Sequence, residues 1–320
     1  GKRVLIIEKN PECGGLVNSF SRDGFRFEAG VRALENAGII FPMLKELDIE
    51  LEVVKSQVSV GKENYIHKII DYHSLNDYNE ILKITYPESE SELDADLKII
   101  RKVMKNKDVL YGVENPNFMD IMGDRDYLFR ELLPWLPKFI FTIGKINRMN
   151  MPVEPYLEKI VRNSSLRDII SQHFFKNTPT FFALSYFSLY LDYFYPKGGV
   201  GSLAIAVENK FLELGGEIQR ETLIERVEAG EHRVIDNKNV SYGYENLLWA
   251  ADLKTFYRIT DTEGYNPKVQ AKFEKSKSRL LEKRGGDSVF TLYLKVDEPP
   301  ESFKKIATGH FFYSPSKQGL

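Results

Sequence analysis

The stretch that most constrains the fold is the beginning of the chain, where a short apolar run is followed by an acid and a glycine pair. Val4 to Ile7 are all apolar, Glu8 follows directly, and Gly14 and Gly15 end the loop. A continuous apolar run of this kind is typical of a strand buried on both faces of a parallel sheet. An acid at the carboxyl end of such a strand can accept hydrogen bonds from the ribose hydroxyls of a dinucleotide. It can equally be a solvated strand end, and these residues alone leave both interpretations open.

Residues 17–30 predict two short strands around a tight turn. Asp23 and Gly24 are residue types that favour a β-hairpin turn. Taken together, the two segments give the pattern E-K-x-x-x-x-G-G followed by D-G-F-x-F-x-x-G. This pattern resembles the flavin amine oxidase and phytoene desaturase superfamily.

The resemblance implies a role for each matching residue. In that superfamily the residue at Glu8 binds the adenosine ribose of FAD, and those at Gly14 and Gly15 border the pyrophosphate. The residue at Gly30 lies close to the flavin. Many relatives have Arg directly after the double glycine, whereas this chain has Leu16, which puts a side-chain contact to the pyrophosphate in doubt.

The resemblance also predicts motifs that are not found in the sequence. A strand, a G-x-G-x-x-G turn and a helix would precede Arg3, and no such glycine turn occurs in the 320 residues. A C-terminal glycine-rich motif that contacts the flavin ring in relatives is not found either. We therefore expect the chain to be a fragment that lacks the N-terminal unit and the C-terminal flavin motif.

Charge and composition exclude several other classes of protein. The 44 basic and 46 acidic side chains leave a net charge of −2, so no nucleic acid partner is expected. The single cysteine, Cys13, permits no intramolecular disulfide and no cysteine-rich metal site, and suits a cytoplasmic location. His67 and His73 are six residues apart, which fits neither the i,i+4 spacing of a helix pair nor the i,i+2 spacing of a strand pair, so we expect no metal site. No apolar run approaches the roughly 18 residues that span a bilayer.

Residues 118–195 are dense in aromatic side chains, and within them residues 132–143 form an apolar patch with Trp135. Four basic residues flank the patch: Arg130, Lys138, Lys145 and Arg148. This combination suits a helix that lies in a membrane interface, and it suits the core of a helical subdomain equally well. Peripheral membrane association is therefore one of two open interpretations.

A second glycine loop begins the later part of the chain. Gly198 and Gly199 precede a predicted helix. A strand at 217–219, further strands to 235 and a buried strand over the apolar run 246–252 are predicted to follow it. A glycine pair before a helix is as often a tight connection as an anion site, so these two glycines are candidates for either a substrate contact or a structural loop.

The order of these motifs carries the finer resemblance. Y-P-x-G-G-x-x-x-L, L-G-G-x-I, I-x-x-V and W-A-A-D follow one another as in the phytoene desaturase and carotenoid isomerase branch, which includes retinol saturase-like enzymes. In that branch the residue at Val227 places its backbone beside the adenine, and the segment with Ala251 lies near the cofactor. The resemblance extends from Gly1 to about Tyr257.

The expected fold class is α/β. A truncated Rossmann-like FAD-binding domain, residues 1–60 and 196–285, is interrupted by a largely helical α+β domain for substrate or membrane contact, residues 61–195 and 286–320. Residues 288–296 alternate in polarity like a half-buried strand of the second domain.

The leading functional hypothesis is an FAD-dependent oxidoreductase acting on a long apolar polyene or isoprenoid, a lipophilic small molecule. The flavin supplies the redox chemistry, so no protein nucleophile is required and no catalytic residue is assigned. His173 and His310 are acid–base candidates, although structural roles are preferred for both. Two alternatives stay open: an amine oxidase or protoporphyrinogen-oxidase-like enzyme, and a non-catalytic binding protein on a degenerate flavin fold.

Overall fold

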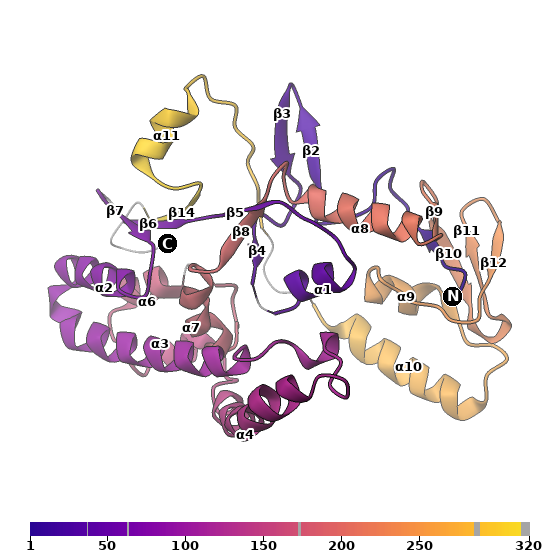
Figure 1. Ribbon diagram of the computed structural model, residues 1–320, viewed down its shortest axis with the longest axis horizontal. Helices are drawn as coiled ribbons and strands as arrows, with labels where there is room; N and C mark the ends of the chain where they lie inside the picture. Colours follow the sequence, from indigo (N-terminus) through magenta and orange to yellow (C-terminus); the bar gives the residue numbers. More distant parts are fainter. Residues whose placement is uncertain (37, 63, 172–173, 285–288, 315–320) are drawn as a thin grey trace. The chain divides into compact units, whose positions relative to one another are not determined.

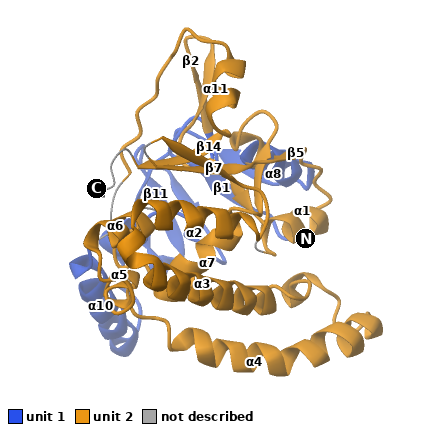
Figure 2. Ribbon diagram, turned by 90° about the vertical axis from the view of Figure 1, so that its left-hand side faces the viewer, with its two compact units in different colours: residues 1–18, 204–285 blue, residues 19–203, 286–320 orange. Residues whose placement is uncertain are grey.

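The computed structural model shows a mixed α/β chain (Figure 1). It describes residues 1–36, 38–62, 64–171, 174–284 and 289–314. The chain divides into two compact units, coloured separately in Figure 2. Unit 1 comprises residues 1–18 and 204–285, and unit 2 comprises residues 19–203 and 286–320.

Unit 1 begins with the apolar run that opens the sequence. Strand β1 (Leu5–Ile7) pairs in parallel with β9 (Glu217–Gln219). A second sheet has the order β12-β11-β10-β13. Its strands are β10 (Ile224–Glu228), β11 (Arg233–Asp236), β12 (Ser241–Gly243) and β13 (Thr260–Asp261). The α-helices are α8 (Gly201–Glu213), whose first three residues belong to unit 2, α9 (Leu253–Ile259) and α10 (Pro267–Glu282).

Unit 2 contains a hairpin and two three-stranded sheets. The hairpin joins β2 (Ser19–Arg22) to β3 (Phe25–Glu28), and its turn residues Asp23 and Gly24 have positive φ angles of 52° and 79°. The predicted hairpin is therefore confirmed. The two sheets have the orders β4-β8-β5 and β14-β6-β7. Their strands are β4 (Leu34–Glu35), β5 (Val53–Lys55), β6 (Val58–Lys62), β7 (Tyr65–Ile69), β8 (Tyr193–Pro196) and β14 (His310–Ser314).

Helices make up most of the remainder of unit 2. They are α1 (Ile40–Glu46), α2 (Ser74–Thr85), α3 (Glu90–Leu110), α4 (Leu133–Asn147), α5 (Val153–Leu157), α6 (Ser164–Ser171), α7 (Thr180–Leu189) and α11 (Pro300–Ile306). A π-helical turn, η3 (Tyr127–Leu132), runs directly into α4. None of the described helices is both long enough and apolar enough to cross a bilayer.

The hydrophobic core of unit 2 lies around α2, α3 and α7, which run close together in Figure 2. Leu93 and Val103 of α3 are each 1% exposed, and Leu184 of α7 is fully buried. Both α3 residues lie on one apolar stripe of this amphipathic helix, and the stripe faces the core.

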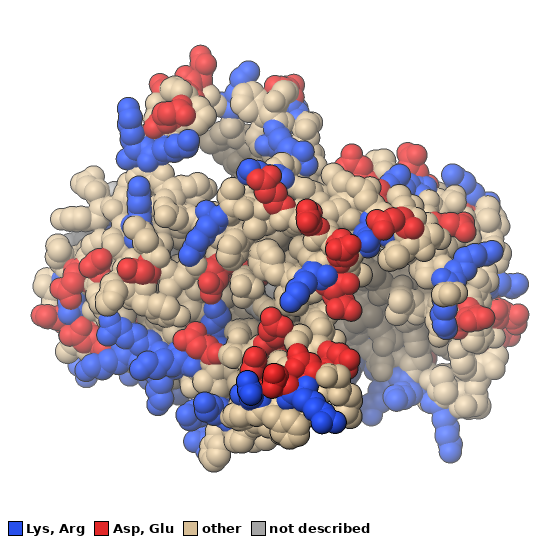
Figure 3. All heavy atoms as spheres, in the orientation of Figure 1, with Lys and Arg blue, Asp and Glu red and all other residues tan. Residues whose placement is uncertain are grey.

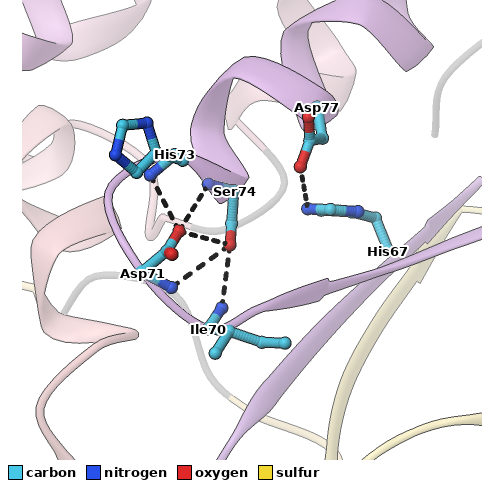
Figure 4. A network of polar contacts seen from close by, with 6 residues as sticks. All are labelled: His67, Ile70, Asp71, His73, Ser74 and Asp77. Atoms are coloured by element: carbon cyan, nitrogen blue, oxygen red, sulfur yellow. Dashed lines mark hydrogen bonds and ion pairs between the residues drawn. The ribbon is translucent and has the colours of Figure 1, made fainter.

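The start of α2 shows why a helix begins at Ser74 (Figure 4). The Asp71 carboxylate accepts hydrogen bonds from the backbone amides of His73, at 2.8 Å, and Ser74, at 3.0 Å. The Ser74 hydroxyl accepts from the amides of Ile70 and Asp71. The Asp71 carboxylate thus satisfies amides at the N-terminus of the helix, and the Ser74 hydroxyl holds the loop that precedes it. The bond from the Ser74 amide is the chief reason that the pKa of Asp71 lies below its usual value.

Two predicted strands are wrong. Residues 247–250 form no strand, and Leu248 is 92% exposed. Residues 289–296 are likewise without strand pairing, and residue 288 lies outside the described residues. A strand needs a neighbour for its backbone hydrogen bonds, and no described strand pairs with either run. Apolar pattern alone does not supply that neighbour.

The compact units differ from the predicted domains in one respect. Residues 19–60 and 196–203 are predicted to belong to the cofactor domain, whereas their contacts place them in unit 2. A domain that binds a cofactor is defined by its ligand contacts, so the functional division stays a prediction.

Candidate functional site

In unit 1, Glu8 is held at the carboxyl end of β1. Its amide donates to the carbonyl oxygen of Gln219 at 2.9 Å, and its carbonyl accepts from the amide of Thr222 at 3.0 Å. Carboxylate oxygen Oε1 accepts from the amide of Asn10 at 2.8 Å. Within the described chain no hydrogen bond to Oε2 is found. The backbone thus fixes an acid with a spare acceptor at the end of a parallel strand, which is the arrangement that a ribose diol requires.

The two glycines of the first loop are needed for different reasons. Gly14 and Gly15 have φ angles of 111° and 56°, which residues other than glycine rarely adopt. A Cβ on Gly14 would also lie 2.7 Å from the carbonyl oxygen of Val17 and 2.8 Å from Cβ of Ala204. A Cβ on Gly15 would meet nothing within 4 Å. Gly14 therefore lets the loop approach α8 closely, whereas Gly15 leaves the loop surface open.

Cys13 lies between this loop and two charged residues. Burial raises the pKa of its thiol, and a hydrogen bond with Glu208 raises it further. Glu208 also forms an ion pair with Arg220. A raised pKa lowers the thiolate fraction, so the environment disfavours a nucleophilic role for Cys13.

The other two candidates in unit 1 occupy contrasting positions. Val227 is fully buried in β10, between Val234 of β11 and Thr260 of β13. Ala251 is exposed in the loop before α9. That loop is held by Asp252, whose carboxylate accepts from the amide of Thr255 at 2.6 Å. These contacts explain why W-A-A-D forms a loop and a helix start instead of a strand.

In unit 2, the second glycine loop ends at a half-buried carboxylate network. Glu28, at the end of β3, accepts hydrogen bonds from the Ser19 hydroxyl at 2.7 Å and from the Val200 amide at 3.2 Å. The Ser19 hydroxyl oxygen accepts from the amide of Gly201 at 3.0 Å. The first amides of α8 are therefore already occupied by groups of this chain. A negative charge here also offsets the positive end of the helix dipole.

The network accounts for the glycine pair. Gly199 has φ of 93°, and a Cβ there would lie 2.6 Å from Oγ of Ser19 and 2.9 Å from Oε1 of Glu28. Gly198 has a φ of 83°, and a Cβ there would lie no closer than 3.6 Å to another atom, Oγ of Ser202. These contacts favour the structural interpretation of the loop. A substrate contact by either glycine stays a prediction.

Glu28 and Ser19 were not singled out in the sequence, although a signal was present. Both lie on the predicted hairpin, and the register pairs Ser19 directly with Glu28. Residues opposite each other on a hairpin share a face, so a serine and an acid there can act together. Tyr195 donates its hydroxyl hydrogen bond to Glu28, and burial together with this bond raises the pKa of Tyr195 to about 12. Gly30, two residues after Glu28, lies in an exposed loop.

The histidines that the structure describes form no common metal site. The His67 imidazole lies 4.0 Å from the Asp77 carboxylate, whereas His73 takes part in the α2 start through its backbone (Figure 4). His310 stacks between Tyr193 and Phe312, and burial lowers its pKa. His173 lies outside the described residues. Among the residues that are described, no three His, Cys, Asp or Glu side chains gather as metal ligands would.

Unit 2 also carries an open groove of about 490 Å³. Its lining is mainly apolar and includes Phe25, Leu294, Val296 and Phe303. The volume is within the usual range of small-molecule sites. A lipophilic ligand is the kind that such a lining accommodates.

Comparison with known proteins identifies the class. The family described as flavin containing amine oxidoreductase matches residues 1–316, so the chain belongs to this family. Its cofactor is FAD, as the sequence predicted. The residues present fit the adenosine end of that cofactor, because Glu8 has a spare carboxylate oxygen beside a side-chain-free loop at Gly15.

Two curated relatives have a more specific name than the family. The chain is 21% identical to all-trans-retinol 13,14-reductase of Danio rerio, over 98% of this chain and 53% of that protein. It is 21% identical to the Homo sapiens enzyme of the same name, over 71% of this chain and 38% of that protein. The chain thus spans about half, or less, of the curated relatives that it matches.

Solved structures agree on the fold. An oxidoreductase from Methanosarcina mazei superimposes with a TM-score of 0.53 at 13% identity, over 87% of this chain and 60% of that one. A variant of putrescine oxidase gives a TM-score of 0.50 at 13% identity, over 83% and 56%. The predicted fold class is confirmed.

Proposed function

We propose that the protein is an FAD-dependent oxidoreductase that acts on carbon–carbon double bonds of a long apolar polyene or isoprenoid. The retinol reductase of Danio rerio matches 98% of the chain, and the substrate in its name belongs to this chemical class. The apolar groove of unit 2 is compatible with a ligand of the same kind. Saturation, desaturation and isomerisation share one cofactor frame, and the names of these relatives favour saturation.

The observation that carries the proposal is the position of Glu8. Its backbone is bonded on both sides, so the carboxylate has a fixed location at the strand end. In our proposal Glu8 orients the adenosine ribose, and Gly14 and Gly15 leave room beside the pyrophosphate. The backbone of Val227 lies beside the adenine, with Ala251 and Gly30 nearer the isoalloxazine. Bound flavin supplies hydride or electron transfer, and the protein supplies binding and orientation.

We propose the domain division on the same basis. Residues 1–60 and 196–285 bind the cofactor, and residues 61–195 and 286–320 bind substrate.

The test is flavin retention by Glu8→Ala in protein expressed from the complete open reading frame that encodes this chain. Loss of a charged acceptor should weaken FAD binding about 10- to 150-fold. Glu217→Ala is the matched control, because Glu217 is exposed at the opposite end of the same strand pair. Absorbance of the dialysed proteins gives the flavin content.

Equal flavin content in Glu8→Ala, Glu217→Ala and the unchanged protein would contradict the assignment of Glu8. Anaerobic reduction by a panel of substrates separates the enzyme alternatives. Turnover of retinoids or carotenoids supports the proposal, whereas turnover of amines favours the amine oxidase alternative. A colourless protein from the complete reading frame would favour a non-catalytic binding protein.

A further inference from the structure

Helix α4 of unit 2 has an apolar face that no other described element covers. The face consists of five large side chains, each between 41% and 76% exposed: Phe129, Leu133, Leu136, Ile140 and Phe141. Leu133, Leu136 and Ile140 are three and four residues apart, which brings them to one side of α4, and Phe141 lies at the border of that side. Burial of such side chains normally stabilises a protein, so their common exposure indicates a surface that binds something.

The opposite side of α4 attaches the helix to unit 2. The Trp135 indole donates to the carbonyl oxygen of Val109 on α3 at 2.5 Å, and its ring lies 4.4 Å from that of Phe139. Thr142, one turn further, is 4% exposed. The exposed face therefore cannot be turned inward without breaking these contacts.

Charge along this part of the chain is unevenly distributed. Residues 132–150 contain no Asp or Glu, and their three charged side chains are Lys138, Lys145 and Arg148. Lys138, Phe141 and Lys145 are three and four residues apart, so they share one edge of the helix. The preceding residues 114–131 are acidic, with five acids and two arginines. In Figure 3, tan and blue surface lies at the foot of the view, where Figure 1 shows α4, below a group of red atoms.

We propose that this face of α4 docks on a lipid bilayer that carries anionic headgroups. The apolar side chains enter the interface, Lys138 and Lys145 extend along the helix edge to the headgroups, and the acidic residues before η3 stay in water. A short apolar helix face with aromatic and basic residues at its edge has the composition of an interfacial helix. The inference deepens and rests on the proposed function, because a bilayer would hold the lipophilic substrate.

The test is co-sedimentation of the protein, expressed from its complete open reading frame, with vesicles of phosphatidylcholine containing phosphatidylserine. The pair Lys138→Glu and Lys145→Glu should weaken binding at least about 25-fold, because each basic side chain near an anionic surface contributes about fivefold. Phe141→Ser should weaken it roughly tenfold. Pure phosphatidylcholine vesicles should retain less of the unchanged protein.

Matched controls lie elsewhere on the surface. Lys268 and Lys275 of α10 are exposed and have the same seven-residue spacing, so Lys268→Glu with Lys275→Glu repeats the charge change. Phe175, which is 58% exposed, allows Phe175→Ser. Circular dichroism melts establish that each variant is folded. The controls should bind vesicles as the unchanged protein does.

Three results would overturn the proposal: no binding of the unchanged protein, equal losses in the controls, or a dimer that Phe141→Ser dissociates. The last would show that a second copy covers α4. Vesicle binding is measured without substrate and separately from flavin content. Loss of flavin with intact vesicle binding would therefore contradict the proposed function alone, and the reverse would contradict the membrane surface alone.

Discussion

Unit 2 buries its apolar residues in a continuous core, whereas unit 1 leaves the apolar strand β1 partly exposed. Leu157 and Leu166 in unit 2 are fully buried. In β1, Leu5 is 41% exposed and Ile6 is 39% exposed. Both units have regular secondary structure, so hydrogen-bonded strands by themselves do not show that a region is well packed. The stability of unit 2 should depend on side-chain packing, and that of unit 1 more on strand pairing and ligand.

The largest expected effect comes from truncating a core aromatic. Phe187 is 2% exposed, so the substitution Phe187→Ala should lower the unfolding free energy by about 3–5 kcal/mol. Ile6→Ala in β1 should cost less than about 1 kcal/mol. Each unit contains one of the two tryptophans, Trp135 in unit 2 and Trp249 in unit 1. Urea unfolding of single-tryptophan variants therefore follows each unit separately.

In this comparison Phe187→Ala should shift the Trp135 transition and leave the Trp249 transition nearly in place. Equal shifts of both transitions would mean that the two units unfold together. A larger loss from Ile6→Ala than from Phe187→Ala would reverse the comparison.

The next effect concerns a buried acid on α3. Asp96 is 3% exposed, and no described group hydrogen-bonds to its Oδ1. It borders a cavity of about 20 Å³ shared with Tyr78, which is room for one water. Burial raises the pKa of Asp96 to about 7. Burial also raises the pKa of Tyr78, which therefore stays neutral over this range.

Because the folded state holds the Asp96 proton more tightly, the unfolding free energy contributed by this group falls as pH rises from about 4 to about 7. The fall is up to roughly 4 kcal/mol and levels off above pH 7. Asp96→Asn should remove it and stabilise unit 2 at pH 8. Denaturant midpoints at pH 5 and pH 8 measure how much stability changes with pH. The same change in Asp96→Asn as in the unchanged protein would contradict this account.

The smallest effect distinguishes two adjacent glycines. Gly199→Ala should cost about 2–3 kcal/mol, since its new Cβ meets Ser19 and Glu28 at a positive φ. Gly198→Ala should cost only about 1 kcal/mol, for φ alone. Thermal unfolding of the two variants is the measurement. Equal losses of stability in the two variants would show that Ser19 and Glu28 move aside for the new Cβ at little cost.

Local signals predicted most of the elements. The Asp23–Gly24 turn indicated the hairpin, because turn chemistry acts within a few residues. Long-range relations were harder. The strand expected at residues 246–252 depends on a neighbour whose presence no local pattern reveals.

In the candidate site, too, residues close in sequence could be predicted and distant contacts could not. Glu8, Gly14 and Gly15 could be found because strand end, acid and glycines are contiguous in the sequence. The Glu28 network could not be found so directly, because the acid acts on Val200, 172 residues later. Only the folded backbone brings a hairpin end to the start of α8.

The parallel pairing of β14 with β6 has a consequence for synthesis of the protein. Thr308 bonds to Ser59, 249 residues earlier, and residues 310–314 then pair with residues 58–62. At typical rates of elongation, β6 would wait about 10–50 s for this partner. During that interval its buried face and unpaired edge are open to other nascent chains and to chaperones. The sheet that β6 begins is therefore completed only by a strand that is synthesised much later in the chain.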